Sequence, residues 1–348
     1  MTSFDRDDLK SKIAHLARED VLIGTSSWKY HGWRGMLYDD ARYVWRGKFA
    51  KSRFEDNCLN EYAEVFKTVC VDGAYYRFPT VKYLEGLAAQ VPDDFQFGFK
   101  VTDAITLKRF TNLPRFGKNA GRPNEHFLDA ELFERAFLEP CKAIRSQVGL
   151  LMFEFSRFYP ADFEHGRDFV AALDGFLGKL PRGWPYGVEM RNSNWLKPEY
   201  FECLYRHGVT HVYNSWTEMP TVEEQMALAG SETNPELVAA RFLLKPGRKY
   251  EDAVKAFKPY TQIKEVNQAA RQAGAALIKN RKSKKTGKTL VFVNNRLEGN
   301  ALQTINAMLE ASEMDDVNNR LLTNITYSGQ MTTNDEIDPN PGSGSQIH

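Results

Sequence analysis

The sequence predicts an α/β protein built as a single (β/α)8 barrel of the TIM-barrel type. Eight short runs rich in β-branched and aromatic residues recur along the 348-residue chain, and amphipathic stretches fill most of the intervals between them. Strands that alternate with helices are joined by crossovers as parallel neighbours, and eight such units match a closed barrel. An open doubly wound sheet would carry a GxGxxG turn after its first strand, but the chain reads "GTSSWKYHGW" there.

The predicted elements follow from these two patterns. The strands are expected at 21–28, 68–76, 95–101, 149–155, 186–192, 211–216, 240–244 and 289–296. The helices, with apolar residues at three- and four-residue spacing, are expected at 54–66, 81–90, 129–146, 166–179, 198–207, 250–272 and 300–312, with a short one within 222–229. The barrel therefore spans residues 21–315, and residues 1–20 form an N-terminal extension.

Three segments fall outside the repeat. Residues 102–128 form a long loop after the third strand, on the face where a barrel's active site lies, and the loop carries the basic residues Lys108, Arg109, Arg115, Lys118 and Arg122. The tail at 330–348 has no aromatic residue and is predicted to be disordered. The basic run "KNRKSKKTGK" at 279–288 precedes the eighth strand and is predicted to be a solvated loop on the opposite face.

Composition restricts the class of protein. The 46 Lys and Arg residues balance 45 Asp and Glu residues, so the net charge of +1 does not draw the whole chain to nucleic acid. Four widely spaced cysteines form no CxxC pair, so neither a disulfide framework nor a thiolate zinc site is indicated. The charged N-terminus and the absence of a long apolar run predict a cytoplasmic protein without membrane contact.

The predicted catalytic residues lie at the carboxyl ends of the strands, where barrels gather functional side chains. In the run "GVEMRNSNW", alternate side chains share a face, so Glu189 and Arg191 point the same way. Lys100 and Glu154 end the third and fourth strands. We expect Glu189 to be a general acid or base held by Arg191, with a buried ion pair that closes the top of the barrel as the structural alternative.

The other polar and aromatic residues of this rim are predicted to bind substrate. They are Trp28, Tyr30, Asp72, Tyr76, Trp195, Asn214, Lys245, Arg248, Asn294, Asn295 and Arg296. Aromatic platforms beside two carboxylates, Glu154 and Glu189, would suit hydrolysis of a sugar. The loops "KPGRKY" and "NNRLEGNA" lie where many barrels hold a phosphate.

No metal or cofactor is predicted. The histidines form no HxH or HExxH motif, and only His31 and His126 fall in loops of the rim. Asp72, Glu154 and Glu189 remain as oxygen ligands for a hard cation, which is the less favoured alternative.

Several motifs, spread in order from about 21 to 312, resemble the YecE-like family, domain of unknown function 72. They are "IGTSSWKYHGWRG", "TVCVDGAYYRFP", "FQFGFKVT", "LLMFEF", "YGVEMRNSNW", "HVYNSW" and "VNNRLEGNA". The resemblance implies a TIM-barrel-like fold and supplies no reaction. The matching positions are Gly24, Trp28, Tyr76, Lys100, Glu189, Arg191, Trp195, Asn294 and Asn295.

Some positions depart from the pattern that the resemblance implies. Asp72 ends a "CVD" run where the family typically reads Glu-Ile-Asn, and Glu154 stands where it often has Gln. Asn192 replaces a His, and Asn214 replaces an Asp. A mechanism that uses the family's carboxylate on the second strand is therefore not transferable to this chain.

The function predicted from these residues is that of a metal-independent hydrolase or lyase. It would act on a small polar substrate, sugar-like or phosphorylated, by acid–base chemistry of Glu, Lys and Arg at the rim. The alternative is a barrel that binds nucleic acid or phosphate without strong catalysis, using the basic residues between 108 and 122. A third possibility is an interaction scaffold, which would expose an apolar patch instead.

Overall fold

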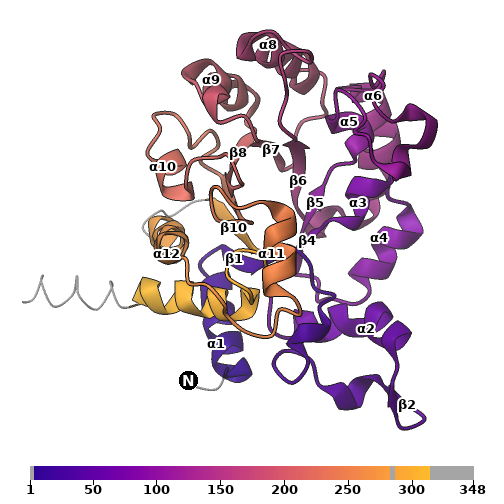
Figure 1. Ribbon diagram of the computed structural model, residues 1–348, viewed down its shortest axis with the longest axis vertical. Coiled ribbons are helices and arrows are strands. Elements are labelled where there is room, and N and C mark those ends of the chain that lie inside the picture. Colours follow the sequence, from indigo (N-terminus) through magenta and orange to yellow (C-terminus); the bar gives the residue numbers. More distant parts are fainter. Residues whose placement is uncertain (1–3, 283–286, 314–348) are drawn as a thin grey trace, which may run out of the picture.

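The chain folds into a closed barrel of eight parallel strands surrounded by helices, as seen in a computed structural model that describes residues 4–282 and 287–313 (Figure 1). Around the barrel the strand order is β1-β10-β9-β8-β7-β6-β5-β4, so each barrel strand pairs with the next one along the chain and the last closes on the first. The strands are β1 (Val21–Thr25), β4 (Thr68–Val71), β5 (Gln96–Lys100), β6 (Val148–Phe155), β7 (Tyr186–Met190), β8 (Thr210–Ser215), β9 (Leu237–Phe242) and β10 (Lys288–Val293).

Helices surround these strands on the outside. The longer ones are α1 (Arg6–Ala17), α2 (Lys51–Ala63), α4 (Val81–Ala88), α8 (Gly166–Leu177), α9 (Pro198–His207), α11 (Tyr250–Phe257) and α12 (Gln268–Lys282), and residues 301–313 are also helical. The shorter ones are α3 (Gly73–Tyr76), α5 (Asp103–Thr106), α6 (Ala130–Phe133), α7 (Glu139–Cys141) and α10 (Val222–Met226). Within the described ranges, none of the helices combines the length and the apolar character that a membrane span requires.

The predicted fold class and all eight predicted strands are confirmed, with differences in the bounds. The seventh strand, expected at 240–244, is β9 and begins earlier, at Leu237. The second strand ends at Val71, because α3 follows at once. The helix expected at 250–272 is two helices, α11 and α12, because Pro259 cannot continue the first.

Other segments contain more structure than the sequence pattern predicts. The N-terminal extension holds α1, whose last residue Ala17 packs against the apolar barrel interior. The loop at 102–128 contains α5 and a 3-10 turn, Pro114–Asn119. The stretch at 129–146 is broken into short helical turns, with Ile144 outside helical geometry. The tail at 330–348 and part of the basic run, 283–286, lie outside the described residues.

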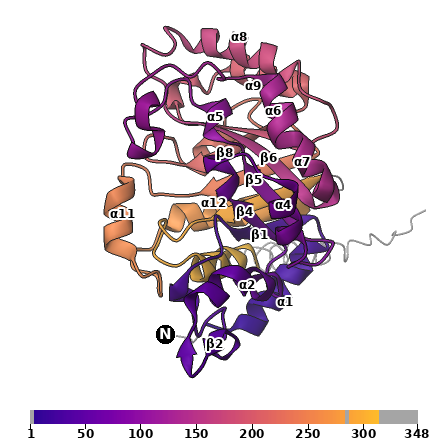
Figure 2. The same ribbon diagram turned by 90° about the vertical axis from the view of Figure 1, so that its right-hand side faces the viewer.

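A two-stranded hairpin, which the sequence pattern did not predict, projects from the barrel. It consists of β2 (Val44–Trp45) and β3 (Lys48–Phe49), paired antiparallel. The hairpin lies at the bottom edge of the molecule in both ribbon views (Figures 1 and 2), away from α8 and α9 at the top.

Successive residues of each strand point alternately into two apolar clusters, one outside the barrel and one inside it. Outward residues such as Val188 and Met190 of β7 pack against the helices. The inward cluster fills the barrel with Leu22, Cys70, Leu150, Met152, Val212, Leu237, Ala239, Leu290 and Phe292. The barrel is therefore a packed core below its carboxyl end, and only that end has room for polar chemistry.

One inward glycine is required by this packing. A Cβ at Gly98 of β5 would lie 2.6 Å from the Phe292 ring, which fills the space that the glycine leaves. Protein interiors are close-packed, so the large Phe292 ring fits inside the barrel only because Gly98 has no side chain.

The helix α11 covers part of the carboxyl end of the barrel. Its residues Ala253 and Phe257 form a small buried cluster with Leu244 and Tyr260, against which Tyr30 and Trp216 pack. In Figure 2, α11 stands at the edge of the molecule, apart from the other helices. The aromatic residues of the first and sixth barrel loops are thus held in place by α11.

Candidate functional site

The top inward layer of the barrel is polar. By strand alternation, the inward positions above the apolar cluster are Ser26, Asp72, Lys100, Glu154, Glu189, Asn214, Arg241 and Asn294. Glu154 and Glu189 face each other directly in the register of β6 and β7. This layer contains three of the four predicted catalytic residues, and the fourth, Arg191, follows directly after β7.

Glu154 is the centre of an ion-pair network that crosses the barrel. Its Oε2 atom lies 2.8 Å from Nη2 of Arg191 and 3.3 Å from Nη1 of Arg241, and it also pairs with Nζ of Lys100. Only 1% of Glu154 is exposed. One carboxylate therefore joins cations from β5, β9 and the end of β7.

Glu189 is fully buried and holds two of the same cations. Its Oε1 atom accepts a hydrogen bond of 3.0 Å from Nε of Arg191, and its Oε2 atom accepts one of 2.6 Å from Nη1 of Arg241. Both carboxylate oxygens are thus bound by arginines, which satisfies a buried charge that would otherwise be costly.

Two aromatic rings lie against the cations of the network. The Arg191 guanidinium lies 3.8 Å from the centre of the Trp216 ring, and Nζ of Lys100 lies 3.6 Å from the centre of the Tyr75 ring. Stacking of this kind stabilises a cation by about 0.5–2 kcal/mol. Since α11 holds Trp216, the position of Arg191 depends on the loops as well as on β7.

The network keeps Glu154 ionised. Burial opposes the charged form, but the positive charges of Arg191, Lys100 and Arg241 outweigh it and lower the pKa of Glu154 from 4.5 to about 2. The Arg241 guanidinium is also disfavoured by burial, yet Glu189 and its other anionic neighbours raise its pKa well above the usual value. Glu154 therefore cannot donate a proton at neutral pH, which argues against the paired-carboxylate hypothesis for sugar hydrolysis.

Asp72 is the carboxylate of this layer that remains open to solvent. Its side chain is 40% exposed, and its Oδ1 atom lies 3.9 Å from Nη2 of Arg241. That distance is too long for a hydrogen bond. Asp72 stands at the end of β4, beside the fully occupied Glu154 and Glu189.

The charges around Glu154 and Glu189 argue against a cation site at these two carboxylates. Three positive side chains, Lys100, Arg191 and Arg241, already surround Glu154 and Glu189. A divalent ion placed there would be repelled by the same groups that hold the carboxylates.

Some predicted substrate-binding residues also make contacts that support the fold. Trp195 stacks on Phe158 and Phe169, each 5.6 Å away between ring centres. The amide of Asn214 donates to the Met190 carbonyl at 3.0 Å. Trp28 is buried, and its carbonyl accepts the Tyr38 hydroxyl.

Lys245 and Arg248 lie apart from the central network. Both pair with Glu265, Lys245 at 3.0 Å, in the connection between α11 and α12. The structure therefore does not bring these two residues together with Lys100 and Arg191.

The segment "NNRLEGNA" is held by its own hydrogen bonds. Asn294 accepts from the Arg296 backbone at 3.0 Å, and Asn295 accepts from the Trp33 ring nitrogen at 3.2 Å. Glu298 is fully buried against Arg271 at 2.9 Å. The backbone N–H of residue 296 is thus already used, and so are those of 297 and 299. This pattern argues against the phosphate loop that the sequence suggested here.

Tyr30, Tyr76 and Arg296 line the mouth from the other side. Tyr30 packs between Trp33 and Tyr260, with ring centres 4.7 and 5.6 Å away. Burial raises the pKa of the Tyr30 hydroxyl, while the positive charge of Arg296 lowers it and Asp72 raises it further. Tyr76 is 63% exposed. Asp72 lies close enough to Tyr30 and Tyr76 for its negative charge to raise the pKa of both hydroxyls.

A cavity of about 250 Å³ reaches the network beside β7. Arg191 lines it together with Trp195, Arg157 and Glu218. Arg157 and Glu218 form an exposed ion pair at its edge. Arg191 is therefore accessible from this cavity.

Several buried polar atoms at this end of the barrel have no hydrogen-bond partner among the described residues. On inward positions they are Ser26 Oγ, Asp72 Oδ1, Asn214 Oδ1 and Arg241 Nε, and in the adjoining loops they are Trp28 Nε1, Asn295 Nδ2 and Arg296 Nε. Buried polar groups are rarely left unpaired in native proteins. Their concentration at one end of the barrel makes that end the candidate binding site.

Arg241 is the residue that sequence reasoning missed. It is 3% exposed and bridges Asp72, Glu154 and Glu189. The strand "LVAARF" offered a signal, because a single charge interrupts an apolar run at an inward position. A strand at 240–244 places its functional carboxyl end at Lys245 and Arg248 instead of at Arg241.

The chain is similar to proteins whose activity is not known. The family model described as "Protein of unknown function DUF72" matches residues 22–325. A DUF72 family protein from Enterococcus faecalis V583 is 20% identical, with a TM-score of 0.57, over 84% of this chain and 95% of that one. Another from Thermotoga maritima MSB8 is 19% identical, with a TM-score of 0.54, over 85% of this chain and 99% of that one.

At this level of identity the two solved structures support the fold alone. The search of curated proteins found no match. The family model, in contrast, covers most of the chain, in agreement with the resemblance found in the motifs. The chain therefore belongs to the DUF72 family.

Proposed function

We propose that the carboxyl end of the barrel is an active site for a small, oxygen-rich ligand that carries negative charge, and that its chemistry is of the hydrolase or lyase type. The observation that carries this proposal is the group of unpartnered buried atoms at Ser26, Asp72 and Arg241. With Trp28, Asn295 and Arg296 included, donors predominate in this group. Such a set matches a ligand rich in acceptor oxygens, such as a sugar acid or a sugar phosphate.

The charge of the network supports an anionic ligand. Lys100, Arg191 and Arg241 provide three positive charges against the two negative charges of Glu154 and Glu189. Asp72 offsets the third charge only weakly, because it lies 3.9 Å from Arg241 and is partly exposed. An anionic group that enters the mouth would therefore gain a favourable interaction with the fixed cations.

The proposed roles differ from those expected from the sequence. Both oxygens of Glu189 and the Oε2 atom of Glu154 are already bound by cations. In this proposal the two carboxylates therefore position Arg191, Arg241 and Lys100. Asp72 is partly exposed and has one buried oxygen without a hydrogen bond, so it would transfer the proton. The preorganised cations would stabilise the oxyanion that forms in the transition state.

Nucleic acid is a less favoured ligand for this surface. Two of the basic residues that would bind it are engaged in the fold, since Arg115 pairs with Asp103 at 2.5 Å and Arg109 donates to the Gly121 carbonyl at 3.1 Å. Binding of an oligonucleotide would fall steeply with salt through counterion release, whereas a small sugar derivative would respond weakly.

The test is a thermal-shift screen of sugars, sugar acids, sugar phosphates, nucleotides and oligonucleotides, with the wild type and two variants. Asp72→Asn removes the open carboxylate and keeps its shape, and Asp56→Asn removes the same charge from the exposed face of α2. A ligand at about 100 times its Kd should add roughly 2.7 kcal/mol of stability. The proposal expects an anionic, oxygen-rich compound to stabilise the wild type and Asp56→Asn, and turnover of that compound to be lost in Asp72→Asn.

Two outcomes would contradict the proposal. Stabilisation by oligonucleotides alone, with a steep salt dependence, would favour the nucleic-acid alternative. Equal turnover in Asp72→Asn and the wild type would remove Asp72 from the mechanism.

A further inference from the structure

The two adjacent helices α8 and α9 carry a group of metal-binding side chains outside the barrel. Asp174 belongs to α8, and Cys203 and His207 belong to α9, one helical turn apart. The helices lie side by side at the top of the molecule in both ribbon views (Figures 1 and 2). Neither the proposed active site nor any motif of the sequence accounts for this group.

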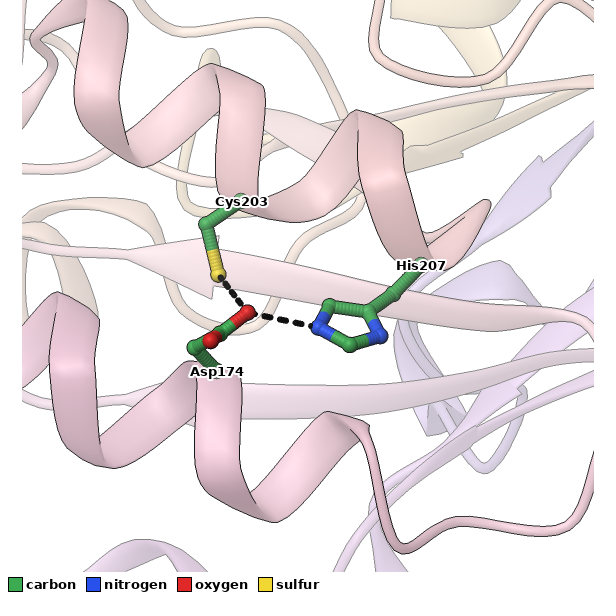
Figure 3. A group of neighbouring side chains, drawn as sticks. All are labelled: Asp174, Cys203 and His207. Atoms are coloured by element: carbon green, nitrogen blue, oxygen red, sulfur yellow. Dashed lines mark hydrogen bonds and ion pairs between the residues drawn. The ribbon is translucent and has the colours of Figure 1, made fainter.

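The three donor atoms converge on one point. Figure 3 shows the Asp174 carboxylate between the other two side chains. Its Oδ1 atom lies 2.7 Å from Nε2 of His207 and 3.8 Å from Sγ of Cys203, and the three ligand atoms all lie within 4.8 Å of one another. A tetrahedral zinc ion with bonds of about 2.0–2.3 Å separates its ligand atoms by roughly 3.3–3.7 Å.

The local structure fixes two of the three ligands. Pro198 begins α9 and Gly208 ends it in the left-handed region, at φ 64°, so the helix ends directly after His207. Cys203 is fully buried against α8, whereas Asp174 and His207 keep 39% and 23% of their side chains exposed. Water can therefore reach the group from one side, where it would supply a fourth ligand.

We propose that Asp174, Cys203 and His207 bind a zinc ion that links α8 to α9. A thiolate, an imidazole and a carboxylate are the three ligand types that zinc prefers in proteins, and calcium or magnesium would require oxygen ligands only. The ion would take the place of the hydrogen bond between His207 and Asp174. Side-chain rotations would have to move Oδ1 of Asp174 and Nε2 of His207 apart from 2.7 Å, while Sγ of Cys203 already lies 3.8 Å from Oδ1.

The site is structural, because it lies away from the mouth of the barrel. His207 is three residues before Thr210, where β8 begins, so it is at the amino end of the strands. The polar layer around Glu154 lies at the carboxyl end. Zinc here would stabilise the packing of two outer helices without reaching the substrate.

One neighbour opposes the metal. Nη2 of Arg206 lies 3.1 Å from the same Oδ1 atom of Asp174, and its side chain is 62% exposed. The guanidinium competes for the carboxylate and brings a positive charge close to the ion. Because it is largely solvated, it can turn away, and its removal should strengthen zinc binding.

The experiment is a zinc titration of the full-length protein after treatment with a chelator, in competition with a chromophoric chelator of known affinity. We expect one equivalent of zinc on the wild type, with affinity at least about tenfold weaker in Cys203→Ser and in His207→Ala. His165→Ala, which removes an exposed histidine from the start of α8, is the matched control and should bind as the wild type does. Arg206→Ala should bind several-fold more tightly.

Cobalt substitution identifies the ligands. Co²⁺ bound to the wild type should show a thiolate charge-transfer band that is absent in Cys203→Ser. If the wild type binds no zinc, or if Cys203→Ser and His207→Ala bind it as tightly as the control, the proposal is wrong. Arg206→Ala keeps the test decisive where a ligand variant folds poorly, because unchanged affinity in that variant would also overturn it.

Discussion

Glu154 provides the sharpest test of the ion-pair network, through the variant Glu154→Gln. The substitution keeps the shape of the side chain and removes the charge that holds Lys100, Arg191 and Arg241. The pKa of Glu154 is lowered from 4.5 to about 2. At 1.36 kcal/mol for each pH unit, this difference corresponds to roughly 3 kcal/mol of stability at pH 7.

The pH dependence follows from the direction of the shift. A carboxyl group whose pKa is lower in the folded state stabilises the fold above its unfolded pKa, and this stabilisation is lost as the pH falls through the folded value. For Glu154 the window runs from 4.5 down to about 2. The difference between the wild type and Glu154→Gln should therefore shrink from roughly 3 kcal/mol at pH 7 to roughly 1 kcal/mol at pH 3.

The measurement is equilibrium urea unfolding followed by tryptophan fluorescence at both pH values. Glu85→Gln, on the exposed face of α4, is the control and should lie within about 0.5 kcal/mol of the wild type. If Glu154→Gln is as stable as Glu85→Gln at pH 7, or if its deficit is the same at pH 3, the network does not stabilise the ionised carboxylate and the reasoning fails.

Three further predictions concern the fold around the site. Gly98→Ala should lower the free energy of unfolding by about 1–3 kcal/mol, because its Cβ would meet the Phe292 ring at 2.6 Å. Adding Phe292→Leu to Gly98→Ala should restore part of this stability in urea unfolding. If the effects of the two substitutions are strictly additive, the contact is contradicted. Glu298→Gln should cost about 3 kcal/mol, since it breaks the buried pair with Arg271, yet leave the Kd of any ligand of the mouth unchanged in a calorimetric titration. Burial lowers the pKa of His211 from 6.5 to about 3, so the neutral ring stabilises the fold above pH 6.5 and this stabilisation is lost as the pH falls. In urea unfolding, the wild type should lose roughly 2 kcal/mol more than His211→Gln between pH 6.5 and 5. Equal losses in the two proteins would contradict the lowered pKa of His211.

The sequence was informative about the barrel because strand and helix periodicities are local. The run around Glu189 and Arg191 showed two charges on one face of a strand, and in the structure both join the same buried network. The inward direction of Glu154 was open in the sequence, since "FEF" allows either face until the register of the whole sheet is known. Its pairing with Glu189 settles that direction.

What the sequence did not reveal depends on closure of the barrel. Arg241 reaches carboxylates that lie 52 and 87 residues away along the chain, on strands that are not its neighbours. The zinc-binding group likewise combines two residues of α9 with one from α8. The spacing of Cys203 and His207 was visible, but their partner is defined only by helix packing.

The stability and affinity of Ser26→Ala test most directly whether the unpartnered atoms serve a ligand. Ser26 is 1% exposed and its hydroxyl has no hydrogen-bond partner within the described structure, while its backbone N–H bonds to Val293 in any variant. If the hydroxyl is kept for a ligand, Ser26→Ala should unfold with a free energy equal to or above that of the wild type, and should bind the anionic ligand about fivefold more weakly. A loss of more than about 1 kcal/mol without ligand, together with unchanged affinity, would show instead that the hydroxyl serves the fold.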